Sequence, residues 1–348
     1  MKRITIAVWI GLLVALAVVS GCSSKEQLRI YSWADNFDED VLKDFEQQFN
    51  VKVRYDTFSN NEELLAKMQA GGAKYDLIQP SDYMVATMIQ LGLLEELNKD
   101  NIPNAKNIAA SYLNLPFDPG NKYSLIYTSG VTGIAYNKKY VKDPITSWAD
   151  LWKAQYKGKV VLLDDQKEII GMGLKKNGYS NSTKDEKQLQ TAVADLKNLL
   201  PSVLAFDTDN IKQKFIAEEA WIGTLWSGDA ARIVIDEKKI DLGYVIPKEG
   251  ALIFADNYAI PKGTKHKELA EKFINYMLQP EISAKNFESV GYSDPNEKAQ
   301  PFHSKEYLSI PMLNLTADQL KQTEWIKDTG EMSKVYDRLW TELKAGKK

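Results

Sequence analysis

The chain has 348 residues, a length that favours two domains. Its residues are 44% hydrophobic and 26% charged, which is typical of a globular protein rather than a disordered, fibrous or polytopic membrane protein. Its net charge is −3, so it has no basic excess to neutralise phosphates, and nucleic acid is not an expected partner. Only two histidines and one cysteine are present, which argues against zinc sites, disulfide scaffolds and Ser-His-Asp triads.

The N-terminal segment has the pattern of a secretory signal peptide. Lys2 and Arg3 precede an apolar run over 4–19, which is shorter than the roughly 20 residues of a spanning helix. The run ends in Val19-Ser20-Gly21-Cys22, which resembles the lipobox of bacterial lipoproteins. That resemblance implies a signal peptide over 1–21, lipidation of Cys22 and a polar tether over 22–27. A plain signal peptide with an accidental cysteine is the alternative.

Strands and helices alternate after the tether. Strands are predicted over 28–31, 51–55 and 75–79, because these segments are apolar or alternate in polarity. Helices are predicted over 38–49, from a capping box at Ser59 to Glu62, and from Ser81 to about Gly92. This order favours a parallel α/β sheet with crossover helices.

The rest of the chain predicts a second lobe. Two extended pieces around Gly130 and Gly133, within 123–137, are expected to leave the first lobe, and 253–260 is expected to return to it. Further strands are predicted over 159–163, 221–226 and 242–246, and helices from about 166 and over 185–200, 267–278 and most of 316–343. The expected N-terminal lobe is 28–130 plus 251–299, and the C-terminal lobe is 131–250 plus 300–348.

Aromatic and acidic side chains recur together just after the predicted strands, where lysine and arginine are scarce. Ligands of α/β sheets bind at the carboxyl ends of strands, so these side chains are expected to share a cleft. Carboxylates neutralise ammonium groups, and aromatic faces attract cations and cover methylene groups, which suits an organic cation with amines at both ends. The candidate ligand-binding residues are Trp33, Asp35, Ser81, Asp82, Tyr83, Asp165, Glu168, Trp226, Asp229, Phe254, Asp256 and Tyr292.

Each candidate also has a purely structural interpretation. Asp165 and Glu168 have the spacing of a capping box at a helix start. The remaining alternatives are helix caps or solvated charges for Asp35, Asp229 and Asp256, and packing for Trp33, Tyr83 and Trp226.

Several short stretches together form a more specific pattern. They are Ile30-Tyr31-Ser32-Trp33, Tyr75-Asp76-Leu77, Pro80-Ser81, Thr146-Ser147-Trp148-Ala149-Asp150-Leu151-Trp152, Tyr156-Lys157-Gly158, Pro247-Lys248-Glu249-Gly250 and Gly291-Tyr292. With them, the chain resembles, essentially end to end, the substrate-binding proteins of spermidine/putrescine ABC importers. The resemblance implies the two-lobed α/β fold of type II periplasmic binding proteins, with crossover strands at the hinge.

The resemblance also implies roles for single residues. It assigns aromatic walls to Trp33, Tyr83 and Trp226, amine-binding carboxylates to Asp165, Glu168 and Asp256, an acidic position to Asp35 and a late-loop aromatic to Tyr292. Three positions depart from a spermidine binder: Phe254 replaces a frequent tryptophan, Ile326 replaces a typical glutamine, and Asp229 is closer to putrescine binders. The ranking of putrescine and spermidine stays open.

The sequence therefore predicts a monomeric, lipid-anchored extracytoplasmic protein that delivers polyamines to an ABC permease, without enzymatic activity, cofactor or metal. The same fold with an amino acid, sugar or ferric ion as ligand is one alternative. An extracellular glycoside hydrolase using Asp165 and Glu168 is another, although two carboxylates three residues apart on one helix are poorly placed to flank a bond.

Overall fold

The computed structural model describes residues 25–71, 74–236 and 240–347. These residues form an α/β fold on one ten-stranded mixed sheet, whose main path is β2-β1-β3-β9-β4-β7-β5-β6. No helix in these ranges is long and apolar enough to cross a membrane. The predicted signal peptide and the predicted lipidation site Cys22 lie outside the described residues.

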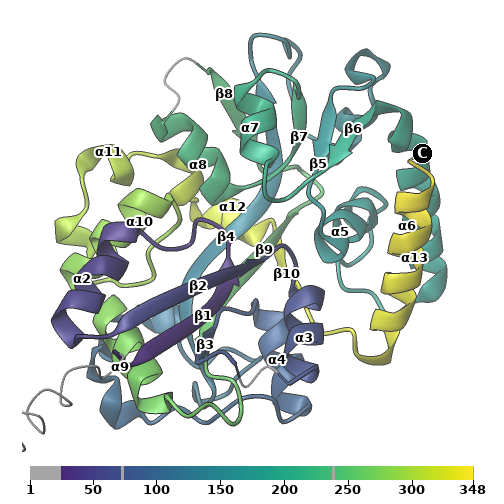
Figure 1. The fold of residues 1–348 in the computed structure, drawn as a ribbon. Helices are drawn as coiled ribbons and strands as arrows, with labels where there is room; N and C mark the ends of the chain where they lie inside the picture. The colour runs from purple at the N-terminus through teal and green to yellow at the C-terminus, as the bar shows by residue number, and fades with distance from the viewer. Residues whose placement is uncertain (1–24, 72–73, 237–239, 348) are drawn as a thin grey trace, which may run out of the picture.

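The first half of the sheet contains parallel strands joined by crossover helices, as predicted. The strands are β1 (Gln27–Trp33), β2 (Lys52–Phe58) and β3 (Leu77–Ile78). The helices of this half, which lies in the lower part of Figure 1, are α2 (Glu39–Phe49), α3 (Asn61–Gln69), α4 (Asp82–Gln90), α9 (Lys267–Met277) and α10 (Pro280–Val290).

The N-terminus of α3 differs from the prediction by one residue. Asn60, rather than Ser59, is the N-cap, and its side chain accepts a hydrogen bond from Glu63 N at 2.9 Å. Glu63 accepts in turn from Ser59 N at 3.1 Å. The shift moves Glu62 from a capping role to a position from which it meets the hydroxyl of Tyr83 at 3.4 Å.

The second half repeats the parallel arrangement. Its strands are β5 (Val160–Leu162), β6 (Val203–Phe206) and β7 (Ile222–Trp226). Its helices are α5 (Gln166–Lys176), α6 (Glu186–Leu199), α7 (Ile211–Ile216) and α13 (Ser333–Ala345). Neither β6 nor α7 was predicted, because each is too short to establish a periodicity.

Two long antiparallel strands, β4 (Ser124–Asn137) and β9 (Ala251–Ala259), join the halves (Figure 1). The prediction of two extended pieces was wrong, since β4 is a single strand of 14 residues. The glycines of β4 do not interrupt the strand but allow neighbouring residues to pack closely against it. A Cβ at Gly130 would lie 2.7 Å from Phe254 Cζ, and one at Gly133 would lie 2.6 Å from the Val245 carbonyl. β8 (Leu242–Val245) pairs with β4, and α8 (Ser227–Asp236) follows β7.

The predicted C-terminal helix is interrupted. Short helices α11 (Lys305–Leu308) and α12 (Ala317–Lys321) precede β10 (Thr323–Trp325), and only then does α13 begin. β10 pairs in parallel with β9. This pairing brings the C-terminal segment to the junction between the halves, where Ile326 lies buried.

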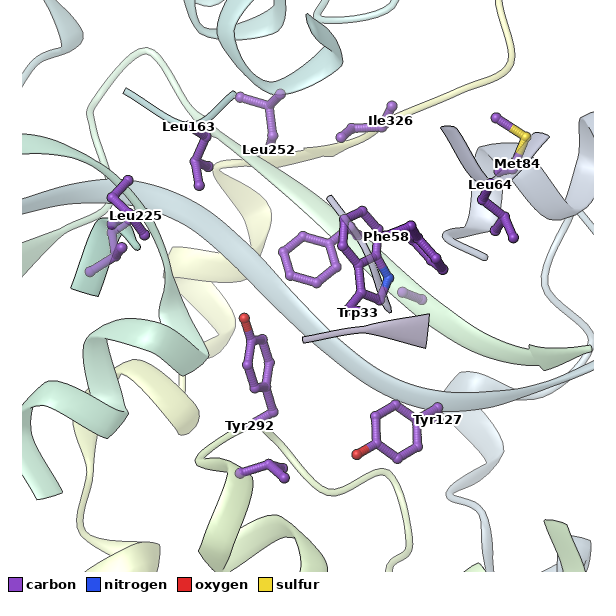
Figure 2. Packing of buried hydrophobic residues seen from close by; sticks show 14 of the residues in the cluster. Trp33, Phe58, Leu64, Met84, Tyr127, Leu163, Leu225, Leu252, Tyr292 and Ile326 are labelled. Atoms are coloured by element: carbon purple, nitrogen blue, oxygen red, sulfur yellow. The ribbon is translucent and has the colours of Figure 1, made fainter. Parts of the chain in front are cut away.

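Buried hydrophobic side chains from both halves belong to one cluster. In Figure 2, Trp33 and Phe58 lie side by side near β4 and β9, and their ring centroids are 4.6 Å apart. Leu163 and Leu225, at the ends of second-half strands, belong to the same cluster. The core therefore continues across the junction that the candidate binding residues surround.

Candidate ligand-binding cleft

A cavity at the junction of the halves gathers the predicted site residues. All of them except Asp82 line it, and Asp82 instead lines an adjoining apolar hollow next to Tyr83. The cavity is also lined by residues that the sequence analysis missed as site residues, namely Ala34, Asn36, Phe58, Asn61, Thr208, Asp209 and Lys212, and by Ile326. The strand-end rule thus located the cleft, and it also covers several missed residues. Ala34 and Asn36 follow β1, and Phe58 ends β2. Thr208 and Asp209 follow β6, a strand that was not predicted.

Aromatic rings from both halves meet inside this cleft. Trp33 ends β1 and Trp226 ends β7, and their ring centroids lie 5.5 Å apart in an edge-to-face arrangement. Phe254 on β9 lies 6.0 Å from Trp226. A Cβ at Gly228 would lie 2.3 Å from the ring of Tyr292, so only glycine allows this tyrosine its place. The rings form walls suited to methylene groups and cations.

Asp256 is a buried carboxylate contributed by hinge strand β9. Ser81 Oγ donates to Asp256 Oδ1 at 2.8 Å, and Asn61 Nδ2 donates to Ser81 Oγ at 3.0 Å. Ser81 precedes α4 but does not use its side chain to cap the helix, which leaves the hydroxyl to orient Asp256. Burial raises the pKa of Asp256 to about 7. No cation of the described residues pairs with it.

Asp82 extends this acidic region in the first turn of α4. The side chain is buried, and Oδ1 has no hydrogen-bond partner among the described residues. Burial raises the pKa of Asp82 well above its ordinary value, and the nearby charges of Asp256 and Glu168 add to the effect. Asp82 therefore lies next to the predicted site, but its side chain does not line the cavity.

Asp165 occupies both positions that the sequence left open, a helix cap and the lining of the cleft. It caps α5 by accepting hydrogen bonds from Lys167 N at 2.9 Å and Glu168 N at 3.1 Å, and it also lines the cleft. Burial, followed by the charge of Glu62, raises the pKa of Asp165 to about 7. A helix N-terminus stabilises a carboxylate here, but not enough to offset its burial.

Glu168 lies one turn further along α5. Its Oε1 accepts a hydrogen bond from Trp226 Nε1 at 3.2 Å, whereas Oε2 is buried without a partner in the described part of the chain. Burial and the charge of Asp165 raise the pKa of Glu168 to about 8. The tryptophan thus fixes the carboxylate while leaving one oxygen for another donor.

Lysine is scarce in the lining of the cleft, as expected, but the one lysine among its described lining residues was not predicted. Lys212, on the unpredicted helix α7, forms ion pairs with Asp35 Oδ2 at 3.0 Å and Asp229 Oδ1 at 3.1 Å. Lys167 is buried next to Asp165, where its Nζ donates to Thr329 Oγ1 at 2.7 Å. Burial lowers the pKa of Lys167 to about 8. Two of the predicted carboxylates, Asp35 and Asp229, are therefore already paired.

The cleft as a whole combines aromatic walls with more buried carboxylates than resident cations. Such carboxylates gain stability when a donor with several N–H groups replaces the lost water. Across the described residues, no group of three or more His, Cys, Asp or Glu side chains is placed to hold a metal ion. The arrangement is suited to an organic ammonium compound.

Comparison with known proteins agrees with this geometry. Residues 40–311 match the family model of bacterial extracellular solute-binding proteins. The chain belongs to this family. It is 37% identical to the spermidine/putrescine-binding periplasmic protein of Escherichia coli K12, over 97% of this chain and 98% of the relative. It is 32% identical to a putrescine/cadaverine-binding protein of Pseudomonas aeruginosa, over 94% and 96% of the two chains.

Solved structures of this family share the fold. A spermidine/putrescine ABC transporter substrate-binding protein of Streptococcus pneumoniae is 35% identical, with a TM-score of 0.77 over 93% of this chain and 100% of the other. A lipoprotein of Treponema pallidum is 27% identical, with a TM-score of 0.82 over 91% and 99% of the two chains. The α/β binding-protein fold and the family predicted from the sequence are confirmed.

Proposed function

We propose that this chain is the polyamine-binding component of an ABC importer and captures putrescine, spermidine or both in the interlobe cleft. The observation that carries the proposal is the pair of buried cleft carboxylates without a cation among the described residues, Glu168 and Asp256, beside aromatic rings from both halves. The names of the similar proteins support a polyamine as the ligand.

The proposed roles follow the geometry of each side chain. Trp33, Tyr83 and Trp226 cover the methylene chain. Asp165 and Glu168 bind one ammonium group from the second half, and Asp256, oriented by Ser81, binds another from the hinge. The other proposed contacts, at the periphery of this set, are Asp35, Asp82, Asp229, Phe254 and Tyr292.

Binding, rather than covalent chemistry, is the proposed activity. The two lobes, 28–130 plus 251–299 and 131–250 plus 300–348, close around the ligand because contacts to both lobes exist only in the closed form. The closed monomer then delivers the polyamine to a membrane permease. Lipidation of Cys22 holds the protein on the extracytoplasmic side of a bacterial membrane, as the lipobox pattern supports.

The test is calorimetric titration of the soluble protein starting at Ser23. Putrescine and spermidine are each titrated at two salt concentrations, beside two matched ligands of the same chain length. Butylamine lacks the second ammonium, and 4-aminobutyrate replaces it with a carboxylate. We expect submillimolar binding of at least one polyamine, weakened by salt, and much weaker binding of both matched ligands.

Absence of heat and of thermal stabilisation with both polyamines would overturn the proposal. Equal binding of 4-aminobutyrate would instead indicate an amino acid ligand, with Lys212 as the cation that receives its carboxylate.

A further inference from the structure

One of the lining residues introduces an ammonium group of the protein itself into the cleft. Lys212 extends from α7 of the second half and pairs with Asp229 of the same half and with Asp35 of the first half, at 3.1 and 3.0 Å. The side chain of Lys212 is 16% exposed, that of Asp229 10% and that of Asp35 73%. The pair with Asp229 is therefore a largely buried, charge-assisted bond, whereas the pair with Asp35 lies at the rim of the cleft.

Lys212 lies at one end of the cavity. Asp35 and Lys212 also line an outer hollow near α2 and α8, whereas Tyr83 and Ile326 also line an apolar hollow on another side. The cavity thus has a charged end at Lys212 and an apolar end at Ile326. A long cation lying between them would direct its last ammonium towards the outer hollow, where Asp35 and Asp229 are occupied by Lys212.

The carboxylates in the remainder of the site have no such partner. Glu168 Oε2 has no hydrogen-bond partner in the described chain, and Asp256 is bonded to the Ser81 hydroxyl rather than to a cation of the described residues. The cleft therefore offers free anionic positions in its interior and a neutralised pair at its charged end. The number of ligand ammonium groups that can pair with a carboxylate therefore depends on how many cleft carboxylates Lys212 leaves unpaired.

We propose that Lys212 is a specificity-determining residue, because its ammonium group occupies the Asp35–Asp229 end in place of a ligand ammonium. The inference rests on the proposed polyamine function and deepens it: the cleft favours a diammonium ligand over longer polyamines. A triammonium ligand must either displace Lys212 or leave its third ammonium group without a carboxylate.

The experiment compares putrescine and spermidine binding to the wild type and to Lys212→Met, which keeps the apolar stem and removes the charge. We expect the ratio of spermidine to putrescine affinity to rise about tenfold or more, as for a newly available charged hydrogen bond. Adding Asp229→Asn to Lys212→Met should reverse most of that rise, because the freed carboxylate is then absent.

Lys214→Met is the matched control. Lys214 lies on the same helix and pairs with Asp207 at 3.1 Å, but it does not line the cleft, so its replacement should leave the ratio unchanged. If Lys212→Met fails to fold by thermal melting, Lys212→Gln serves instead.

Two outcomes would overturn the inference while the proposed function stands. An unchanged ratio would show that Lys212 does not select ligand length. An equal loss of affinity for both polyamines would show that it only holds the lobes together. If the wild type binds neither polyamine, the proposed function itself fails, and this inference fails with it.

Discussion

Asp256, which we propose binds a ligand ammonium, illustrates the cost of burying a carboxylate. Burial disfavours its charge, and the Ser81 hydroxyl compensates only in part. We expect Asp256→Asn to weaken polyamine binding by roughly 10- to 100-fold, because a charged hydrogen bond is lost. The empty variant should melt no lower than the wild type, since the asparagine oxygen still accepts from Ser81. Calorimetry and thermal melting test both parts.

A matched control is Asp318→Asn, whose side chain is 87% exposed at a distance from the cleft. Asp318→Asn should change neither the polyamine affinity nor the melting temperature. A large fall in melting temperature for Asp256→Asn, with binding retained, would mean that the residue has a structural role only.

The raised pKa values of three cleft carboxylates predict a pH dependence. Burial raises the pKa to about 7 for Asp165 and Asp256, and to about 8 for Glu168. The folded state therefore binds more protons than the unfolded state between about pH 4 and pH 8, and the free energy of unfolding of the empty protein should fall as pH rises through this range.

A diammonium ligand reverses this effect, because it favours the ionised carboxylates. We expect affinity to rise from pH 6 to pH 8, with net proton release on binding. Titration in buffers of different ionisation enthalpy measures the released protons directly. Affinity that is constant across this range would show that the carboxylates are already ionised in the empty cleft.

At the scale of secondary structure, helix α5 has two functions that depend on one residue. Asp165 caps the helix and lines the cleft, so the two contributions can be separated by substitution. Asp165→Ser keeps a capping oxygen and should weaken ligand binding with little loss of stability. Asp165→Ala should also lower the free energy of unfolding, by about 0.5–2 kcal/mol. Chemical denaturation and calorimetry measure the two effects.

Helix α6 supplies the control for this comparison. Its N-cap, Asp185, accepts from Lys187 N and Gln188 N in the same way but is exposed and does not line the cleft. Asp185→Ala should reduce stability without reducing affinity. Full binding by Asp165→Ser would contradict the proposed ligand role of Asp165.

The sequence predicts most elements because their signals are local. Asp38 and Asp185 were expected at helix starts and cap α2 and α6, and the strand-end rule gathered aromatic and acidic residues at one cleft. β10 could not be found, because three residues become a strand only by pairing with β9, which lies far away in the sequence. Lys212 was missed for a similar reason, since its position in the cleft is recognised only from its ion pair with Asp35, which comes from the opposite half.

At the scale of the whole molecule, the contacts across the cleft join the two halves. Trp33 meets Trp226, Lys212 meets Asp35, and Ser59 Oγ donates to Asp209 Oδ2 at 2.9 Å. We expect polyamine to shift the population towards this closed form and to reduce the radius of gyration in small-angle scattering. Ligand at 100 times its Kd should stabilise the fold by about 2.7 kcal/mol.

Asp256→Asn at the same ligand concentration should show both changes reduced, because a Kd raised roughly 10- to 100-fold leaves the ligand at only about 1 to 10 times that Kd and the stabilisation at about 0.4–1.4 kcal/mol. Thermal stabilisation without compaction would mean that the ligand binds one half alone and that closure is not coupled to binding.

The two ends of the described chain are attached to different halves. Near the start, Glu26 meets His266 beside α9, whereas near the end Lys344 meets Asp164 beyond β5. Opening and closing should therefore change the separation of these ends. A donor fluorophore fused before Glu26 and an acceptor fused after Lys344 would convert lobe movement into an energy-transfer signal, making the protein the frame of an optical sensor for its ligand.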